Sequence, residues 1–231
     1  MKTAITPEKL KDHLHYNWWK YVLLVVLTLS TWSIFFEVTA YRPPEDKKLQ
    51  ILVYGLGDSQ EAQLWLDTVR QRDFPDQEEF VVEYLTPDGT YGSMVLSTRI
   101  IAGDGDLLIL PRDMAQSFMA EGFYVPLEEA EDVLALCEAA GINVERGWRR
   151  NTETGERHLL AIPVSGIPRV RGWLYNTAED YYLGVRVAGG NNDNAMALLR
   201  IFLQEAASGT APGAWQPETP LVLTEVPTAA P

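Results

Sequence analysis

Two kinds of hydrophobic pattern divide this chain. Near the amino terminus Tyr21–Phe36 forms a continuous apolar run of sixteen residues without a charged side chain. At about 1.5 Å per residue a helix of this length covers roughly 24 Å, and the longer stretch from Trp18 to Ala40 covers about 35 Å, enough to cross a hydrocarbon core of about 30 Å. The run is apolar on every face and follows the interfacial pair Trp18 and Trp19, a pattern that predicts a membrane segment and not a buried core helix.

The charges beside this run predict its orientation. Four lysines precede it, opposed by two acidic residues, whereas the three basic residues after it are balanced by three acidic ones. The positive-inside rule then places residues 1–17 in the cytoplasm, a signal-anchor in the cell membrane at 18–40, a spacer at 41–48 and the rest outside the cytoplasm. A cleaved signal peptide is the alternative, because Val38-Thr39-Ala40 offers the small residues that signal peptidase requires. The long leading segment favours the retained anchor.

After the spacer, short apolar runs alternate with helical patterns. Three runs are predicted strands: Leu49–Tyr54, Phe80–Leu85 and Asp106–Leu110. In the helical pattern after the second strand, one set of residues recurs at helical spacing and marks the face that we expect to be buried: Tyr91, Met94, Val95, Thr98, Ile101 and Ala102. Alternation of strand and helix predicts a mainly parallel open sheet with right-handed crossovers. The expected fold class is therefore α/β, in one domain over residues 49–207.

The second half of the domain has weaker signals. A hairpin is predicted where a polar, Gly-containing connection separates two segments, Gly147–Arg150 and Arg157–Val164. Gly172–Tyr175 and Tyr182–Val187 are two further predicted strands, and Asn191–Asp193 is expected to cap a final helix. Residues 208–231 are rich in Ala, Thr, Gly and Pro without periodicity, which is typical of a disordered tail.

Charge excludes one class of partner. The chain holds 19 basic and 32 acidic residues, and the part after Lys48 keeps 12 and 27 of these, a net of −15. Phosphate backbones would repel such a domain, so we expect no nucleic-acid partner. The single cysteine, Cys137, rules out an internal disulfide and lies on the apolar side of a helical pattern, where an inert thiol is expected.

Candidate chemistry is sparse. The three histidines are far apart in the sequence, and no nucleophile-elbow motif occurs, so we expect neither a metal site nor a cofactor nor an enzyme. In open α/β sheets ligands gather beyond the carboxyl ends of the strands. The candidate ligand-binding residues there, with an anionic group favoured, are Gly57, Asp58, Ser59, Pro111 and Arg112. The alternative is that Asp58 or Ser59 only caps a helix and Arg112 only faces solvent.

One family resemblance is carried by three segments: Gly103–Leu127, Leu159–Val164 and Leu174-Tyr175-Asn176. They resemble the first lobe of extracytoplasmic solute-binding proteins of ABC transporters. The resemblance implies a one-lobed relative, because only some fifteen residues separate Asn176 from the final helix cap. A single lobe cannot close on a solute as a two-lobed clamp does, so a small-molecule ligand stays uncertain.

Three function classes follow from these observations. The favoured one is a membrane-anchored extracytoplasmic binding or interaction module, beside a partner protein in the membrane. The alternatives are an accessory subunit of a membrane transport or envelope assembly, and an extracytoplasmic enzyme.

Overall fold

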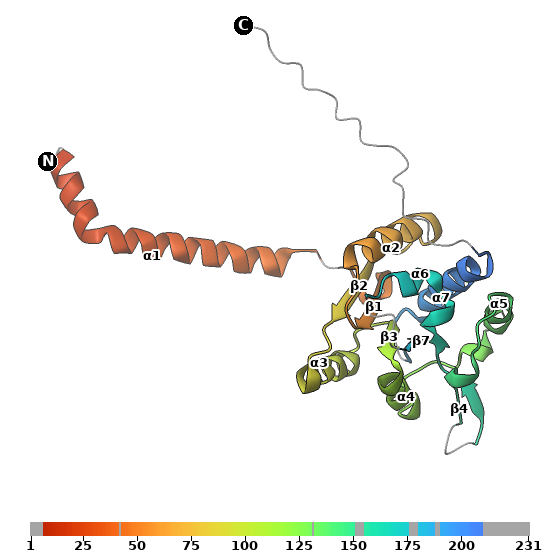
Figure 1. Ribbon diagram of the computed structural model, residues 1–231. Helices are drawn as coiled ribbons and strands as arrows, with labels where there is room; N and C mark the ends of the chain where they lie inside the picture. The colour runs from red at the N-terminus through yellow and green to blue at the C-terminus, as the bar shows by residue number, and fades with distance from the viewer. Residues whose placement is uncertain are drawn as a thin grey trace, which may run out of the picture. The chain divides into compact units, whose positions relative to one another are not determined.

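The computed structural model describes residues 7–41, 43–130, 132–150, 155–175, 180–187 and 190–209 (Figure 1). Contacts divide the chain into two units, Met1–Arg42 and Pro43–Pro231. The predicted disordered tail lies outside the described residues from 210 onward. In the first unit the described part is one helix, α1 (Pro7–Thr39).

Helix α1 contains a segment, His15–Thr39, that is long and apolar enough to cross a membrane, and none of it is buried within the protein. Its threonine hydroxyls do not need water as a partner, because Thr28 and Thr31 donate to the carbonyls of Leu24 and Leu27, each at 2.8 Å. This back-bonding is what a helix surrounded by hydrocarbon requires of its polar side chains. The segment overlaps residues 18–40, and its role as an anchor stays a prediction.

The second unit is built around a five-stranded sheet with the strand order β2-β1-β3-β7-β6. Its strands are β1 (Lys48–Tyr54), β2 (Glu79–Leu85), β3 (Leu107–Pro111), β6 (Ile162–Pro163) and β7 (Tyr181–Val185). Strand β1 pairs in parallel with β2 and β3, whereas β7 pairs antiparallel with β3 and β6. Four of these five strands run in one direction and β7 runs against them, which confirms the α/β class with a mainly parallel open sheet.

Helices cover both faces of the sheet (Figure 1). They are α2 (Ser59–Asp73), α3 (Gly89–Ala102), α4 (Arg112–Ala120), α5 (Val133–Ala139), α6 (Pro168–Gly172) and α7 (Asn192–Ala207). Alternation along β1 sends Leu49, Ile51 and Val53 into one core and Leu52 and Tyr54 into the other. The first core is closed by α2, α5, α6 and α7, and the second by α3 and α4.

Three aromatic rings lie at the centre of the larger core. Trp65 of α2 and Phe202 of α7 stack with centroids 5.0 Å apart, and Trp173 meets Phe202 edge-on at 5.5 Å. Trp173 is fully buried although it follows the last residue of the short helix α6. This packing holds the chain segment that continues through Leu174 toward the end of β1.

The predicted hairpin is present as β4 (Trp148–Arg150) and β5 (Arg157–Leu159), paired antiparallel with Trp148 opposite Leu159. The predicted strand at Gly172–Tyr175 is wrong. Gly172 ends α6, and only Leu174 makes a bridge, with Gly57. Because the segment follows directly on the end of α6, it forms no longer strand, and Leu174 is the one residue of the segment that bridges to the loop after β1.

The predicted inward face of α3 is wrong except at Val95, which packs against the second core. Tyr91, Met94 and Ile101 are 71%, 67% and 78% exposed, and α3 instead buries Leu96 and Ile100. The physical reason lies at Gly92, where a Cβ would come within 2.6 Å of the Thr86 carbonyl oxygen. Only glycine allows the helix to approach so closely, and this approach selects the buried face.

Candidate functional site

The loop after β1 is tied to the helix that follows it. The carboxylate of Asp58 accepts hydrogen bonds from the backbone N–H groups of Gln60, at 3.0 Å, and Glu61, at 2.9 Å. Asp58 is thus the N-cap of α2, as predicted, and Ser59 is the exposed first residue of the helix. Because a carboxylate of the protein already accepts from these N–H groups, they cannot donate to an external anion unless Asp58 moves.

Gly57 is covered by the segment that leaves α6. It bridges to Leu174, and the N–H of Asp58 donates to the Trp173 carbonyl at 2.9 Å. A Cβ on Gly57 would lie 2.0 Å from that carbonyl oxygen. The glycine therefore serves a close backbone contact, and its predicted role in holding a ligand stays a prediction.

Pro111 and Arg112 have different neighbours from Gly57–Ser59. Pro111 ends β3 opposite Tyr181 of β7, and the N–H of Arg112 donates to the Asp180 carbonyl at 2.8 Å. The Arg112 guanidinium reaches along α4 to Gln116, and this directs it toward the β4–β5 hairpin.

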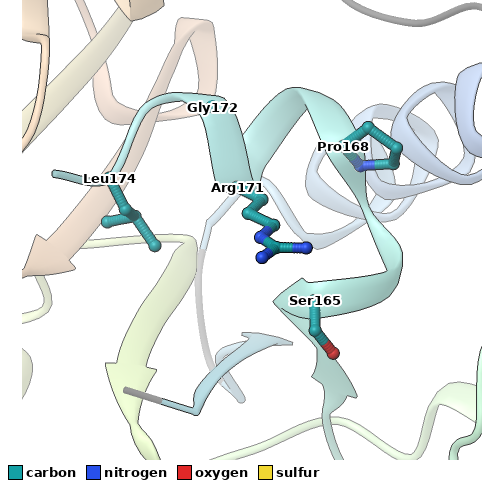
Figure 2. A pocket seen from close by; sticks show the side chains of 5 residues that line it. All are labelled: Ser165, Pro168, Arg171, Gly172 and Leu174. Atoms are coloured by element: carbon teal, nitrogen blue, oxygen red, sulfur yellow. The ribbon is translucent and has the colours of Figure 1, made fainter. Parts of the chain in front are cut away.

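A shallow groove adjoins the covered loop (Figure 2). It has a volume of about 330 Å³ and is lined by Ser165, Pro168, Arg171, Gly172 and Leu174. Arg171 extends from α6 toward the turn that carries Ser165, and no ion pair holds its guanidinium among the described residues. Leu56 and Tyr175 lie beside Gly57 and Leu174, and both side chains are exposed. The N–H of Tyr175 donates to the Leu56 carbonyl at 2.9 Å. This part of the carboxyl edge thus offers one cation and a small apolar surface.

Ser165 also lines a second hollow of about 330 Å³, on the other side of the same turn. There Arg146 and Asp180 face each other at 3.4 Å, both well exposed. An exposed pair of this kind contributes little to stability, so both side chains can exchange partners with a ligand.

A larger pocket, of about 470 Å³, lies between the carboxyl end of α4 and the hairpin, and we call it the basic pocket. It is lined by Met119, Ala120, Glu121, Gly122, Tyr124, Pro126, Arg149, Arg150, His158 and Leu160. Its size is within the range of small-molecule sites. The sequence analysis did not predict this pocket, because its two halves are separated by more than twenty residues and share no motif.

Arg149, which lines the basic pocket, shares a hydrogen-bond acceptor with Arg112, which is not among the lining residues. With its amide oxygen turned toward both donors, Gln116 accepts from Arg112 Nε and from Arg149 Nη2, each at 3.1 Å. Two guanidinium groups thus meet at one neutral oxygen. Within the described residues neither of them, nor Arg150, makes an ion pair with an acidic side chain, and the exposed Glu121 is the acidic residue of the pocket lining.

His158 is held at the wall of the same pocket. Its Nδ1 lies 2.6 Å from Glu128 Oε1, while Glu128 Oε2 accepts from the N–H of Leu159 at 2.8 Å. Nε2 lies 3.8 Å from Glu156. Glu128 thus orients the imidazole ring through Nδ1, and the arginines Arg149 and Arg150 line the same pocket.

Tyr124 is buried against Gly184, and its hydroxyl has no hydrogen-bond partner among the described residues. Burial raises the pKa of this phenol, so it stays protonated and is available as a donor. Cys137 is buried as well, and burial raises the pKa of its thiol to about 11, which makes it a poor nucleophile. In the described part of the chain no three His, Cys, Asp or Glu side chains gather closely enough to hold a metal ion.

Comparisons with known proteins give a distant likeness to a solved structure. No family model and no curated protein matches the chain. Among solved structures, an extracellular solute-binding protein family 1 from Alicyclobacillus acidocaldarius aligns with 54% of this chain at 19% sequence identity and a TM-score of 0.34. The aligned part spans 29% of that protein's length.

Proposed function

We propose that this chain is a membrane-anchored extracytoplasmic binding module whose ligand or partner places an acidic group in the basic pocket. The observation that carries the proposal is the convergence of Arg112 and Arg149 on the neutral amide oxygen of Gln116. Two like charges held together repel each other, and an anion between or beside them removes that repulsion. Guanidinium groups also bind carboxylate and phosphate oxygens in bidentate geometry.

The setting strengthens the proposal. The residues after Lys48 carry a net charge of −15, so a group of arginines that makes no ion pair with the acidic side chains of the described residues is unusual for this surface. The carboxyl-edge groove with Arg171 offers a second, weaker cation for the same class of ligand. Of the predicted site residues Gly57, Asp58, Ser59, Pro111 and Arg112, only Arg112 takes part in this proposal. It shares the Gln116 amide oxygen with Arg149 of the basic pocket.

The anchor in this proposal is α1. Its apolar segment is unburied, and its threonine hydroxyls donate to carbonyls of the same helix, both of which suit a lipid environment. The lysines before the segment favour a cytoplasmic amino terminus and an extracytoplasmic domain. A cytoplasmic reporter that is active when fused after Ala207, with an extracytoplasmic reporter inactive there, would contradict this topology. A mature chain that begins at Tyr41 would favour the signal peptide.

Ligand binding is tested on the full-length protein in detergent with two acidic probes, inorganic phosphate and succinate. A ligand that binds only the folded state raises the melting temperature, because saturation a hundredfold above Kd adds about 2.7 kcal/mol. We expect a rise for the wild type and its loss in Arg149→Gln. The matched control is Arg72→Gln, which removes an exposed arginine of α2 that pairs with Asp73. An equal rise in Arg149→Gln would contradict the proposed site.

The partner is tested by crosslinking in the native membrane followed by purification. Recovery of a permease or envelope complex would support the accessory-subunit alternative as the setting of the module. Hydrolytic turnover by the purified protein, lost on substitution of one carboxylate, would instead favour the enzyme.

A further inference from the structure

The β4–β5 hairpin places two polar side chains next to each other at the wall of the basic pocket. Arg149 of β4 and His158 of β5 are directly opposite each other in the antiparallel pair. Side chains paired in this way point to the same face, with Cβ atoms about 4.5–5.5 Å apart. Both residues line the pocket. A ligand that reaches the Arg149 guanidinium therefore also comes within reach of the imidazole ring.

Glu128 decides which nitrogen of this ring carries the proton. Its Oε1 lies 2.6 Å from Nδ1 of His158, and its Oε2 accepts from the N–H of Leu159 at 2.8 Å. An ionised carboxylate has no proton to donate, so Nδ1 is the donor in this contact. In the neutral ring the other nitrogen, Nε2, is then an acceptor.

This acceptor nitrogen receives no hydrogen bond from the described part of the chain. Nε2 lies 3.8 Å from Oε2 of Glu156, which is too far for a hydrogen bond, and an ionised carboxylate has no proton to donate. The charges around the ring are of both signs: the carboxylates of Glu128 and Glu156, and the guanidinium of Arg149 opposite. With the ring neutral, the pocket presents a guanidinium donor and an acceptor nitrogen side by side.

We infer that the basic pocket takes a hydroxy acid, with the carboxylate on Arg149 and the hydroxyl donating to Nε2 of His158. The inference rests on the proposed function and adds that the ligand needs a donor beside its acidic group. A hydroxyl on the carbon next to the carboxylate has this arrangement, because the two protein groups are neighbours on the hairpin. An ammonium group at that position fits less well, since its positive charge would lie beside the guanidinium.

The remaining lining suits the carbon skeleton of such a ligand. Met119, Pro126 and Leu160 contribute apolar atoms, in a pocket of about 470 Å³. Tyr124 also lines the pocket, and its buried hydroxyl has no hydrogen-bond partner among the described residues. Tyr124 therefore competes with His158 for the ligand hydroxyl, and the experiment compares these two side chains.

Malate and succinate are the probes, because malate is succinate with one hydroxyl next to a carboxylate. Their affinities for the full-length protein in detergent are measured by titration calorimetry at pH 8, where both are dianions and an imidazole is ordinarily neutral. We expect the wild type to bind the better malate enantiomer about three- to tenfold more tightly than succinate, as one net hydrogen bond produces.

Three variants assign this preference to one side chain. His158→Phe keeps a ring and removes both nitrogens, so it should bind malate and succinate equally while its affinity for succinate stays. Tyr124→Phe removes the competing hydroxyl and should keep the preference for malate. His15→Phe changes an exposed histidine of α1 and is the matched control, which should behave as the wild type.

Glu128→Gln tests the positioning role of Glu128. A glutamine amide offers one acceptor and one donor where the carboxylate offers two acceptors. The N–H of Leu159 can only donate, so the amide oxygen turns to it and the amide nitrogen donates to Nδ1 of His158. The ring proton then moves to Nε2. We expect the malate preference to be lost and the nitrogen NMR signals of the ring to exchange their protonation pattern, which a merely structural role of Glu128 would not produce.

The outcomes separate this inference from the proposed function. Equal affinities for malate and succinate in the wild type, with both lost in Arg149→Gln, would overturn the inference and leave the proposed function standing. Binding of neither probe would overturn both. A preference that disappears in Tyr124→Phe but survives in His158→Phe would assign the hydroxyl to the phenol and overturn the inference.

NMR of the wild type decides the matter even where His158→Phe does not fold. The inference requires a neutral His158 ring at pH 8 with its proton on Nδ1. A proton on Nε2, or on both nitrogens, would contradict it, because Nε2 could then accept no hydrogen bond from a ligand.

Discussion

Gly57→Ala is the substitution that most directly tests how the carboxyl edge is held together. The new methyl group would lie 2.0 Å from the Trp173 carbonyl oxygen and 2.4 Å from Cε1 of Tyr84. The carbonyl cannot turn away at no cost, because it accepts from the Asp58 N–H at 2.9 Å. Trp173 cannot retreat either, since its ring is packed between Trp65 and Phe202. The two backbone segments must therefore separate.

The expected loss can be worked from the contacts that separation breaks. Two backbone hydrogen bonds join the segments, Asp58 N–H to Trp173 and Tyr175 N–H to Leu56. They contribute about 0.5–1.5 kcal/mol each, and overpacking adds about 1–3 kcal/mol. Alanine also lowers the conformational entropy of the unfolded chain, which offsets about 0.4–1 kcal/mol of this loss. We expect Gly57→Ala to lower the free energy of unfolding by about 2–4 kcal/mol.

Urea denaturation of the full-length protein in detergent, followed by tryptophan fluorescence, measures this difference. The control is Gly172→Ala, because a Cβ there meets no atom within 4 Å and the residue is the exposed end of α6. That variant should match the wild type or gain up to about 1 kcal/mol. If Gly57→Ala were as stable as Gly172→Ala, the close contact with Trp173 would not exist in solution.

Three further predictions use the same denaturation assay. Asp58→Ala should cost about 1 kcal/mol through loss of the N-cap, whereas Ser59→Ala should stay within about 0.5 kcal/mol; equal costs would contradict the assignment of the cap. Phe202→Ala should cost about 3–5 kcal/mol, because its fully buried ring contacts both Trp65 and Trp173, and a loss below about 1 kcal/mol would be incompatible with that packing. Burial raises the pKa of Asp106 above 3.8, so the folded state binds this proton more tightly than the unfolded chain. As pH falls through the raised pKa toward 3.8, the wild type should therefore gain stability relative to Asp106→Asn, and a pH-independent difference would refute the shift.

Local patterns explain why part of the fold could be predicted. The apolar run Tyr21–Phe36, the first strands and the Asp58 cap each depend on residues close together in sequence. Their periodicity and hydrogen-bonding capacity are properties of a short segment. The first strands and the cap appear in the structure within one residue of the expected positions, and the apolar run lies inside the longer helix α1. The α/β class follows from the order of such segments along the chain.

The direction of β7 and the inner face of α3 could not be predicted in this way. The pattern of α3 is apolar on two sides, and the contact of Gly92 with the Thr86 carbonyl decides which side meets the sheet. Strand β7 is fully buried and has the pattern of a central strand, but its pairing partner β3 lies seventy or more residues earlier in the chain. These choices depend on contacts between segments that the sequence places far apart.

The candidate site divides in the same manner. From the sequence alone, Arg112 was a candidate because it follows a strand, and its expected neighbours were Gly57, Asp58 and Ser59. Tertiary packing instead brings the hairpin residue Arg149 to the same Gln116 oxygen as Arg112, while Asp58 caps its own helix. The sequence determined the length and apolar character of α1, the α/β alternation and the net charge, since these depend on composition and short-range order. Only the tertiary structure decided where the cations gather, because electrostatic repulsion and binding depend on distance in space.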